Sequence, residues 1–180
     1  MKNLEEQTLD SEQLVDGKLL KVYRDKVTLP DGTTSHREWI DHPGAAAVVA
    51  LLDDDHVLMV RQYRYPARGT FLEIPAGTLD GNEAAEKAVV RELKEETGYT
   101  AQRWTLLGAL YPCLGYSNEI IHIFLAQALQ SGEQQLDSGE FIEVEKVPFE
   151  EAVSQAQRGA FRDSKTIAGL LWAAGHLKSK

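Results

Sequence analysis

The segment from Gly77 to Tyr99 constrains this chain more than any other part of its sequence. It consists of Gly77, five residues, Glu83, seven residues, and then Arg91-Glu92-Leu93-Lys94-Glu95-Glu96-Thr97-Gly98-Tyr99. We expect a helix over about residues 83–97, ended by Gly98 in the left-handed conformation that terminates many helices. At about 100° per residue, Glu92, Glu95 and Glu96 share one face of that helix. The same face begins, one or two turns earlier, with Ala85, Ala88 and Val89, which are residues typical of a core.

Three carboxylates on one helix face need a counter-charge. Like charges at this spacing repel one another, and carboxylates near a helix C-terminus oppose the helix dipole. Burying them unpaired costs free energy or raises their pKa values. A divalent cation binds such hard oxygen ligands and keeps coordination positions open for phosphate oxygens. The pattern therefore indicates a metal site, and a solvated charged face with Arg91 and Lys94 as counter-ions is the alternative.

The loop before the helix is expected to support that site. Gly77, with Gly81 nearby, lets the backbone fold against the helix, so that a carbonyl could join the metal ligands. Glu83 lies on the opposite side of the helix from Glu92, so we expect it to brace the loop together with Arg91. A carboxylate that merely favours the helix dipole is the alternative for Glu83.

Composition narrows the class of partner. The 180 residues suit one domain with a small appendage, and their net charge of −9 argues against nucleic acid or an anionic membrane as a partner. An acidic protein that acts on a polyanion needs local positive charge, which bound cations supply. Cys113 is the single cysteine, and the longest apolar run, residues 45–52, is too short to span a bilayer. We expect a soluble, cytoplasmic protein.

Turn signals divide the chain into a short β-element and a main domain. We expect residues 1–16 to be a frayed polar start and residues 18–40 to form a hairpin around Pro30-Asp31-Gly32. The break at His42-Pro43-Gly44 places the boundary between residues 1–43 and 44–180. The three aspartates at 53–55 predict a solvated turn rather than a calcium loop. Beyond the break we expect strands near 45–52, 56–61, 70–74, 104–111, 120–128 and 141–147, and helices near 83–97, 148–158 and 164–177.

Residues 77–99 resemble the Nudix box, GX5EX7REUXEEXGU, at every fixed position, with Tyr99 as the last bulky apolar residue. Other runs resemble the ADP-ribose pyrophosphatase branch of that family, so that the resemblance covers about residues 18–175. These runs are the Pro-Asp-Gly hairpin, residues 60–66 (VRQYRYP), residues 73–77 (EIPAG), residues 111–119 (YPCLGYSNE) and residues 141–144 (FIEV).

The resemblance implies an α/β fold: an α/β/α sandwich with a mixed sheet, preceded by a small antiparallel β-element that commonly helps to build a homodimer. It also implies that Mg²⁺ or Mn²⁺ is held by Glu92 and Glu96 with help from Glu95 and the Ala76 carbonyl. The implied reaction is hydrolysis of a nucleoside diphosphate sugar, which for ADP-ribose yields AMP and ribose 5-phosphate.

The resemblance assigns further site residues less completely. Arg64 matches a position that contacts a phosphate or terminal ribose, and Glu119 matches a residue of the substrate pocket. Relatives often carry two acidic residues, one apart, before the run that matches FIEV, and here these positions are Ser138 and Glu140. We favour Glu140 as general base, with another helix glutamate such as Glu95 as an alternative, and an exposed loop carboxylate is the other interpretation of Glu140.

Substrate binding leaves several alternatives open. Arg61 and Arg64 lie three apart, so in a strand they point to opposite faces and we expect one of them to enter the site. Tyr23 or Trp39 could stack on a base, although core packing suits each of them too. The substrate could also be another diphosphate, such as GDP-mannose, NADH, FAD or a dinucleoside polyphosphate. A Nudix-like fold without catalysis, used as a ligand sensor, is the competing class.

Overall fold

A run of seven buried residues, Ala45–Leu51, forms β4, the central strand of the main sheet. The computed structural model describes residues 3–53 and 55–179. β4 pairs in parallel with β9 (Ile121–Ser131) and antiparallel with β5 (His56–Arg64) and with β7 (Ala76–Thr78). Because β4 is covered on both faces, its sequence is continuously apolar rather than alternating.

The main sheet is mixed and has the strand order β10-β5-β4-β9-β8. Its outer strands are β10 (Ile142–Pro148) and β8 (Tyr99–Leu110), and β6 (Gly69–Glu73) pairs with β5. β4 and β5 pair at only two positions, Ala50 with Leu58 and Leu51 with Val57. Beyond these positions the two strands take different partners, β7 and β6, so the sheet is split between β4 and β5.

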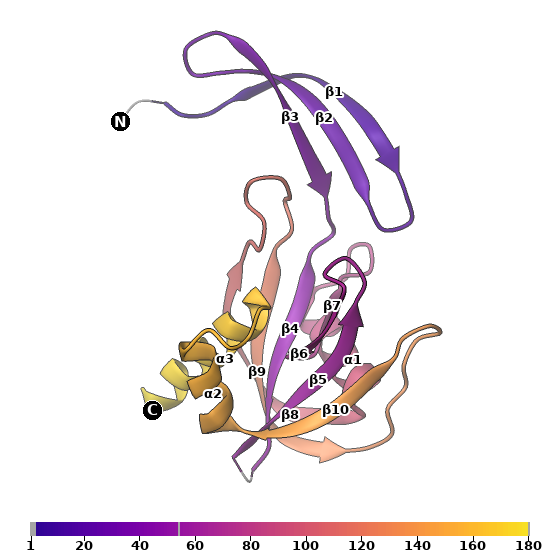
Figure 1. Cartoon of the computed structure of the whole chain (residues 1–180), viewed down its shortest axis with the longest axis vertical. Helices are drawn as coiled ribbons and strands as arrows, with labels where there is room; N and C mark the ends of the chain where they lie inside the picture. The colour runs from indigo at the N-terminus through magenta and orange to yellow at the C-terminus, as the bar shows by residue number, and fades with distance from the viewer. Residues whose placement is uncertain (1–2, 54, 180) are drawn as a thin grey trace. The chain divides into compact units, whose positions relative to one another are not determined.

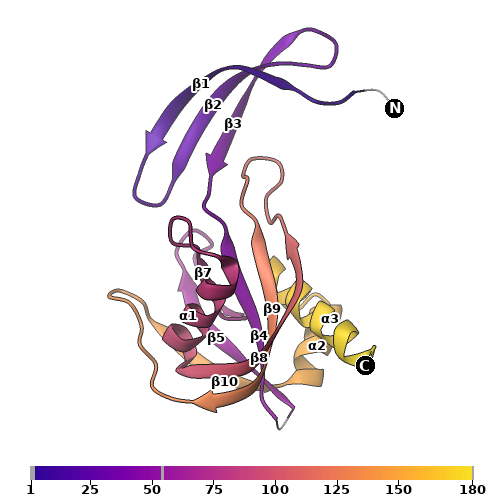
Figure 2. The ribbon, with the colours of Figure 1, turned by 180° about the vertical axis from the view of Figure 1, so that it is seen from behind.

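Helices cover both faces of this sheet (Figures 1 and 2). On one face α1 (Ala85–Thr97) packs Ala88, Val89 and Leu93 against even-numbered residues of β4. On the other face α2 (Phe149–Gln157) and α3 (Ser164–Lys178) pack against the odd-numbered residues. The expected α/β/α sandwich with a mixed sheet is confirmed. Among the described residues, no helix has both the length and the apolar character needed to cross a bilayer.

Two helix ends follow from local sequence. α1 ends at Gly98, which has φ 75° and donates its N–H to the Lys94 carbonyl, as expected from the sequence. α3 begins after Asp163, whose side chain accepts a hydrogen bond from the Thr166 N–H. These caps fix the ends of the two helices that carry the charged residues described below.

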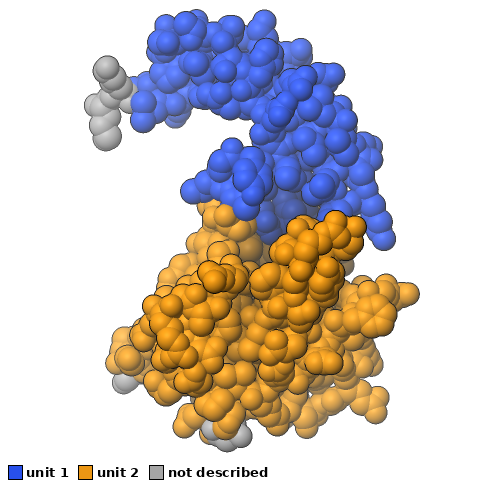
Figure 3. All heavy atoms as spheres, in the orientation of Figure 1, with its two compact units in different colours: residues 1–43, 113–119 blue, residues 44–112, 120–180 orange. Residues whose placement is uncertain are grey.

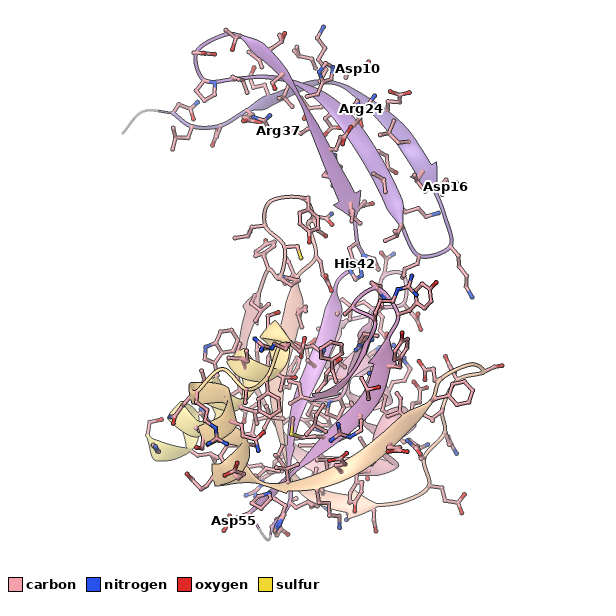
Figure 4. All side chains as sticks on the ribbon, in the orientation of Figure 1. Asp10, Asp16, Arg24, Arg37, His42 and Asp55 are labelled. Atoms are coloured by element: carbon pink, nitrogen blue, oxygen red, sulfur yellow. The ribbon has the colours of Figure 1, made fainter. Side chains whose placement is uncertain are left out.

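Residues 1–43 and 113–119 form a separate compact unit, coloured differently from the rest in Figure 3. Its antiparallel sheet has the order β1-β2-β3, with β1 (Gln7–Asp16), β2 (Lys21–Thr28) and β3 (Thr34–Asp41). The expected hairpin is present: Gly32 has φ 84° in the β2–β3 turn. Figure 4 labels Arg24 on β2 and Arg37 on β3, which pair with Glu38 and Glu6.

The expectation of a frayed start at residues 1–16 was wrong for residues 7–16, which form β1. Every side chain of β1 is exposed, so no hydrophobic alternation marks the strand in the sequence. The strand is held by its backbone ladder with β2, from Gln7 opposite Thr28 to Asp16 opposite Lys21, and by the pair Ser11–Asp25. Residues 1 and 2, and Asp54 in the expected aspartate turn, lie outside the described residues.

Candidate active site

The close approach of Gly77 to Glu92 defines the centre of the candidate site. A Cβ atom on Gly77 would lie 2.0 Å from Cδ of Glu92, so only glycine fits without displacing that carboxylate. β7 brings Gly77 to this position by pairing with β4, and α1 brings Glu92 from the other side. The loop backbone therefore folds against the acidic face of α1, which is formed by Glu92, Glu95 and Glu96, as the glycine pattern predicts.

Arg91 holds the acidic residues around it. Its guanidinium contacts Glu83 at 2.9 Å, Glu92 at 2.6 Å and Glu95 at 3.1 Å, and it donates to the Thr78 carbonyl at 3.2 Å. The hydrogen bond to Glu83 raises the pKa of Arg91, and Arg91 in turn lowers the pKa of Glu83. The expected Glu83–Arg91 pair is thus present, and it ties the loop after β7 to α1.

Glu96 is the buried member of the acidic face. It is 4% exposed and accepts a hydrogen bond from the Ala76 N–H at 2.9 Å. Burial raises the pKa of Glu96 to about 8, and repulsion from Glu92 and Glu140 acts in the same direction. Burial also raises the pKa of Glu92. For both carboxylates, the positive charge nearby is therefore too small to offset the effect of burial.

These residues fit a divalent cation by their chemistry. The partly buried Glu92 and the buried Glu96 are oxygen donors of the kind that Mg²⁺ and Mn²⁺ bind, and a cation near them would favour their ionised forms. Among residues 3–53 and 55–179, no group of three or more His, Cys, Asp or Glu side chains is arranged to hold a metal ion. In this structure the carboxylates of Glu92 and Glu95 instead form ion pairs with the guanidinium of Arg91. Ala76 contacts Glu96 through its N–H, and the role of its carbonyl as a metal ligand stays a prediction.

Arg64 belongs to a partly buried ionic cluster. It donates to Glu73 through Nε at 2.9 Å and through Nη2 at 2.7 Å. Glu73 also accepts from Lys165, and Lys165 lies 3.0 Å from Asp163. Burial favours protonation of Glu73, but Arg64 and Lys165 outweigh it and lower the pKa of Glu73 to about 2. Glu73 and Glu96 both raise the pKa of Arg64 by attraction, so the cluster is electrostatically linked to the acidic face.

Arg61 and Glu140 line a cleft of about 390 Å³. The cleft is also lined by Gln62, Tyr63, Thr70, Leu136, Phe141, Ile142 and Glu143. Arg61 pairs with Glu145 across the β5–β10 ladder, whereas Arg64 pairs with Glu73 on β6. β5 runs without a bulge from Val60 to Arg64, so the two arginines, three residues apart, point to opposite faces of β5, as expected. Glu140 raises the pKa of Glu92 and Glu96 by repulsion, which brings it within electrostatic reach of the acidic face.

Glu119 lies in the unit that contains the N-terminal sheet. Its carboxylate is 3.9 Å from Nδ1 of His42, and the neighbouring Asn118 donates to Asp41 at 2.7 Å. In the same unit the rings of Tyr23 and Trp39 stack with a centroid distance of 5.2 Å. Trp39 also donates its indole N–H to Asp25 at 3.0 Å. The two partly buried rings therefore pack against each other.

Sequence reasoning missed Glu73, Lys165 and Asp163. In the sequence, Glu73 lies within the run EIPAG, and Lys165 lies at the start of the expected helix over residues 164–177. One signal was available: a lysine in the first turn of a helix opposes the helix dipole, so it calls for an anionic partner. The Asp163-x-x-Thr166 spacing is an N-cap pattern that fixes where this lysine lies.

Comparison with known proteins identifies the family. Residues 41–170 match the NUDIX domain, and residues 6–40 match the nucleoside diphosphate sugar hydrolase N-terminal domain. The chain is 44% identical to an ADP-ribose pyrophosphatase of Bacillus subtilis, over 92% of this chain and 91% of that protein. It is 38% identical to a methanol dehydrogenase activator of Bacillus methanolicus, with the same coverage of both chains.

A solved structure shares the fold. The crystal structure of an ADP compounds hydrolase superposes with a TM-score of 0.86 and covers 99% of this chain and 98% of the other, at 24% identity. A further relative, 35% identical over 74% of each chain, is a GDP-mannose pyrophosphatase of Yersinia enterocolitica. The complete 77–99 motif, the fold and these matches lead to one conclusion: the chain is an enzyme of the Nudix hydrolase family.

Proposed function

We propose that this enzyme hydrolyses the pyrophosphate bond of ADP-ribose, with Mg²⁺ as cofactor and AMP and ribose 5-phosphate as products. Two of its relatives, from Bacillus subtilis and Mycobacterium tuberculosis, are named ADP-ribose pyrophosphatases. The observation that carries the proposal is the pair Glu92 and Glu96 on one face of α1, beside the backbone of Ala76 and Gly77, where burial raises the pKa of both carboxyl groups. Mn²⁺ is the expected substitute for Mg²⁺, since both bind oxygen ligands.

The metal would be held by Glu92 and Glu96, with Glu95 and the Ala76 carbonyl as further ligands. When bound, it neutralises charge on the diphosphate and polarises the phosphorus that is attacked. Gly77 keeps the loop close to Glu92, and the Glu83–Arg91 pair fixes the loop against α1. These residues orient the acidic face before substrate arrives, which is how positioned charges contribute most to phosphoryl transfer.

The remaining roles fall to residues around the acidic face. Glu140 is our choice for the general base that orients or deprotonates the attacking water, since it lines the cleft and acts electrostatically on Glu92 and Glu96. Arg64 would contact a substrate phosphate, as the family resemblance implies. Its guanidinium is attracted by Glu96, so it lies within electrostatic reach of the acidic face. Arg61 would contact the substrate from the cleft. Glu119 is proposed as a substrate-pocket residue on the family resemblance.

We further propose that residues 1–43 serve dimerisation and complete the substrate site of the domain formed by residues 44–180. Among the described residues of the N-terminal unit, Val27 is the only buried hydrophobic residue. Large apolar residues such as Leu9, Leu14 and Leu20 are exposed there. A second copy of the chain would cover them and remove apolar surface from water.

As location we propose the cytoplasm, where the single Cys113 would stay reduced.

A different diphosphate substrate is the second candidate. A GDP-mannose pyrophosphatase is among the relatives, and the box itself does not distinguish between nucleoside diphosphate sugars. The methanol dehydrogenase activator shows that a relative has also been named for its effect on another enzyme. This second candidate differs from the first only in which nucleoside diphosphate enters the site, and the acidic face stays at the centre of that site.

A substrate panel tests the proposal. Purified enzyme is incubated with ADP-ribose, GDP-mannose, NADH, FAD and diadenosine polyphosphates, with Mg²⁺, Mn²⁺ or EDTA, and products are separated by chromatography. We expect the highest kcat/KM for ADP-ribose, equal amounts of AMP and ribose 5-phosphate, and no turnover in EDTA. AMP release from NADH with none from ADP-ribose would refute the substrate assignment.

A matched pair of variants tests the site. Glu96→Gln removes a buried carboxylate of the acidic face, and Glu86→Gln removes an exposed carboxylate on the same helix. We expect at least about a hundredfold loss of kcat for Glu96→Gln and a change below twofold for Glu86→Gln. Unchanged turnover in Glu96→Gln would favour a site elsewhere in the molecule.

A further inference from the structure

The first turn of α3 lies at the split of the main sheet. The Thr166 hydroxyl accepts a hydrogen bond from the Ile74 N–H at 2.9 Å, and the Pro75 carbonyl accepts one from the Val48 N–H at 2.9 Å. Ile74 and Pro75 are the two residues at which the chain passes from β6, the partner of β5, to β7, the partner of β4. α3 thus supplies a hydrogen bond that no neighbouring strand supplies at this point.

Lys165, next to Thr166, is placed at a cost in free energy. The residue is 8% exposed, and a buried ammonium group loses its hydration. It also lies in the first turn of α3, where the helix dipole repels positive charge. Two anions compensate: Lys165 donates to Oε2 of Glu73, and its Nζ lies 3.0 Å from Oδ2 of Asp163. Anchoring a helix does not by itself account for burying a charged side chain at this cost in free energy.

Glu73 is shared between two cations. Its Oε2 accepts from Nη2 of Arg64 at 2.7 Å and also from Lys165, while Oε1 accepts from Nε of Arg64 at 2.9 Å. These bonds use one edge of the guanidinium, and the Arg64 side chain remains 41% exposed. Because Lys165 offsets part of the Glu73 charge, less of the positive charge on Arg64 is cancelled.

We propose that Lys165 is a positioning residue for substrate binding: by sharing Glu73 with Arg64, it fixes the guanidinium and keeps its positive charge available to a phosphate of a nucleoside diphosphate. The inference rests on the proposed function, because Arg64 is the residue that would contact the phosphate. It extends the site from the loop and helix of the Nudix box to α3, which begins about 65 residues further along the chain.

The contrasting role is purely structural. If Lys165 only held α3 against the sheet, its loss would lower thermal stability and would leave ligand affinity of the folded protein unchanged. If it supplies charge, the affinity for a diphosphate must follow the sign of the charge change in the cluster. Ligand affinity therefore separates the two roles.

Three variants carry the test, with a fourth as control. Lys165→Met removes the charge and keeps a long apolar side chain, and Lys165→Arg keeps the charge. Asp163→Asn keeps a good N-cap residue and removes one of the two anions next to Lys165. Lys178→Met makes the same charge change at the other end of α3, on an exposed side chain.

ADP, a plain nucleoside diphosphate, is the probe, and its dissociation constant is measured by titration calorimetry on the full chain in Mg²⁺. We expect Lys165→Met to weaken ADP binding about tenfold, which corresponds to about 1.4 kcal/mol, and to raise KM by a similar factor with a smaller change in kcat. Lys165→Arg should restore binding to within about threefold, Asp163→Asn should tighten it about twofold, and Lys178→Met should leave it unchanged.

The outcomes distinguish this inference from the proposed function. ADP affinity within twofold of wild type in Lys165→Met, or weaker binding in Asp163→Asn, overturns the positioning role. If Lys165→Met does not fold, Asp163→Asn decides alone. Wild-type enzyme that binds ADP but does not hydrolyse ADP-ribose refutes the substrate assignment, while the affinity series still tests Lys165. Wild-type enzyme that fails to bind ADP overturns both.

Discussion

Replacing Gly77 by Ala should separate folding from catalysis. The added Cβ would lie 2.0 Å from Cδ and from Oε1 of Glu92, and 2.4 Å from Oε2. All three atoms are at the end of a flexible side chain, so the side chain can rotate away while the backbone stays in place. The variant should therefore keep the fold and displace one carboxylate of the acidic face.

The effect on stability can be estimated from opposing contributions. Gly77 does not have a positive φ, so alanine fits its backbone and reduces the entropy of the unfolded chain, which stabilises by about 0.4–1 kcal/mol. Moving Glu92 off its preferred rotamer costs about 0.5–1.5 kcal/mol. The net change in the free energy of unfolding is about 1 kcal/mol or less, which shifts Tm by no more than about 4 °C.

The effect on activity is expected to be much larger. Glu92 is a partly buried residue of the acidic face and one of the proposed metal ligands, and displacing even the supporting partners of such ligands costs about 10- to 100-fold. We therefore expect kcat/KM to fall at least about 100-fold, with weaker Mn²⁺ binding in an electron paramagnetic resonance titration.

Gly175→Ala is the matched control. No atom lies within 4 Å of a Cβ at Gly175, which is in α3, so alanine should stabilise the helix by about 0.5–1 kcal/mol and leave kcat/KM unchanged. Circular dichroism gives Tm for both variants. A drop in Tm above about 8 °C for Gly77→Ala would show that the backbone and not Glu92 had moved. Activity within threefold of wild type would refute the requirement for Glu92 at this place.

Three further predictions follow from burial and backbone geometry. Gly98→Ala should destabilise by about 2–4 kcal/mol, seen as a lower urea midpoint, because φ is 75° and a Cβ would lie 2.8 Å from backbone atoms of residues 132–134. Glu73 has a folded-state pKa of about 2 against an ordinary 4.5, so its contribution of about 3 kcal/mol is complete above pH 4.5 and is lost as pH falls towards 2; Glu73→Gln should remove this pH dependence from denaturant titrations, and an unchanged acid limb would contradict the assignment. Glu96 has its pKa raised from 4.5 to about 8, so its ionisation destabilises the metal-free fold increasingly from pH 4.5 to pH 8; Glu96→Gln should raise Tm in EDTA at pH 9 but not at pH 4, and Mg²⁺ should reduce the difference at pH 9.

Short-range patterns made much of the site predictable. Glu83 and Arg91 lie eight residues apart in a loop and helix whose geometry follows from the sequence, and their contact at 2.9 Å is present. The shared face of Glu92, Glu95 and Glu96 follows from the helical repeat alone. The sandwich itself was predicted from the family resemblance.

Contacts between residues far apart in the sequence, and strands without hydrophobic alternation, were not predictable in this way. Lys165 and Glu73 are 92 residues apart, and they meet only because β6 and β7 split the sheet beside α3. β7 has three residues, too few to carry a periodic pattern, and β1 has no apolar face for a pattern to mark. In each of these cases the backbone ladder or the tertiary packing, and not local hydrophobicity, determines the structure.

The charges of the main unit support the proposed need for an added cation in a chain with a net charge of −9. Each arginine near the acidic face is already bound to carboxylates: Arg61 to Glu145, Arg64 to Glu73, and Arg91 to the glutamates of its own helix. Paired arginines attract a polyanion weakly, because their partners repel it. The partly buried Glu92 and the buried Glu96 would repel it further unless they are neutralised. Substrate affinity should therefore depend steeply on Mg²⁺ concentration, and Lys165 is the protein's own contribution to the same balance, since it offsets Glu73 where Arg64 would meet the phosphate.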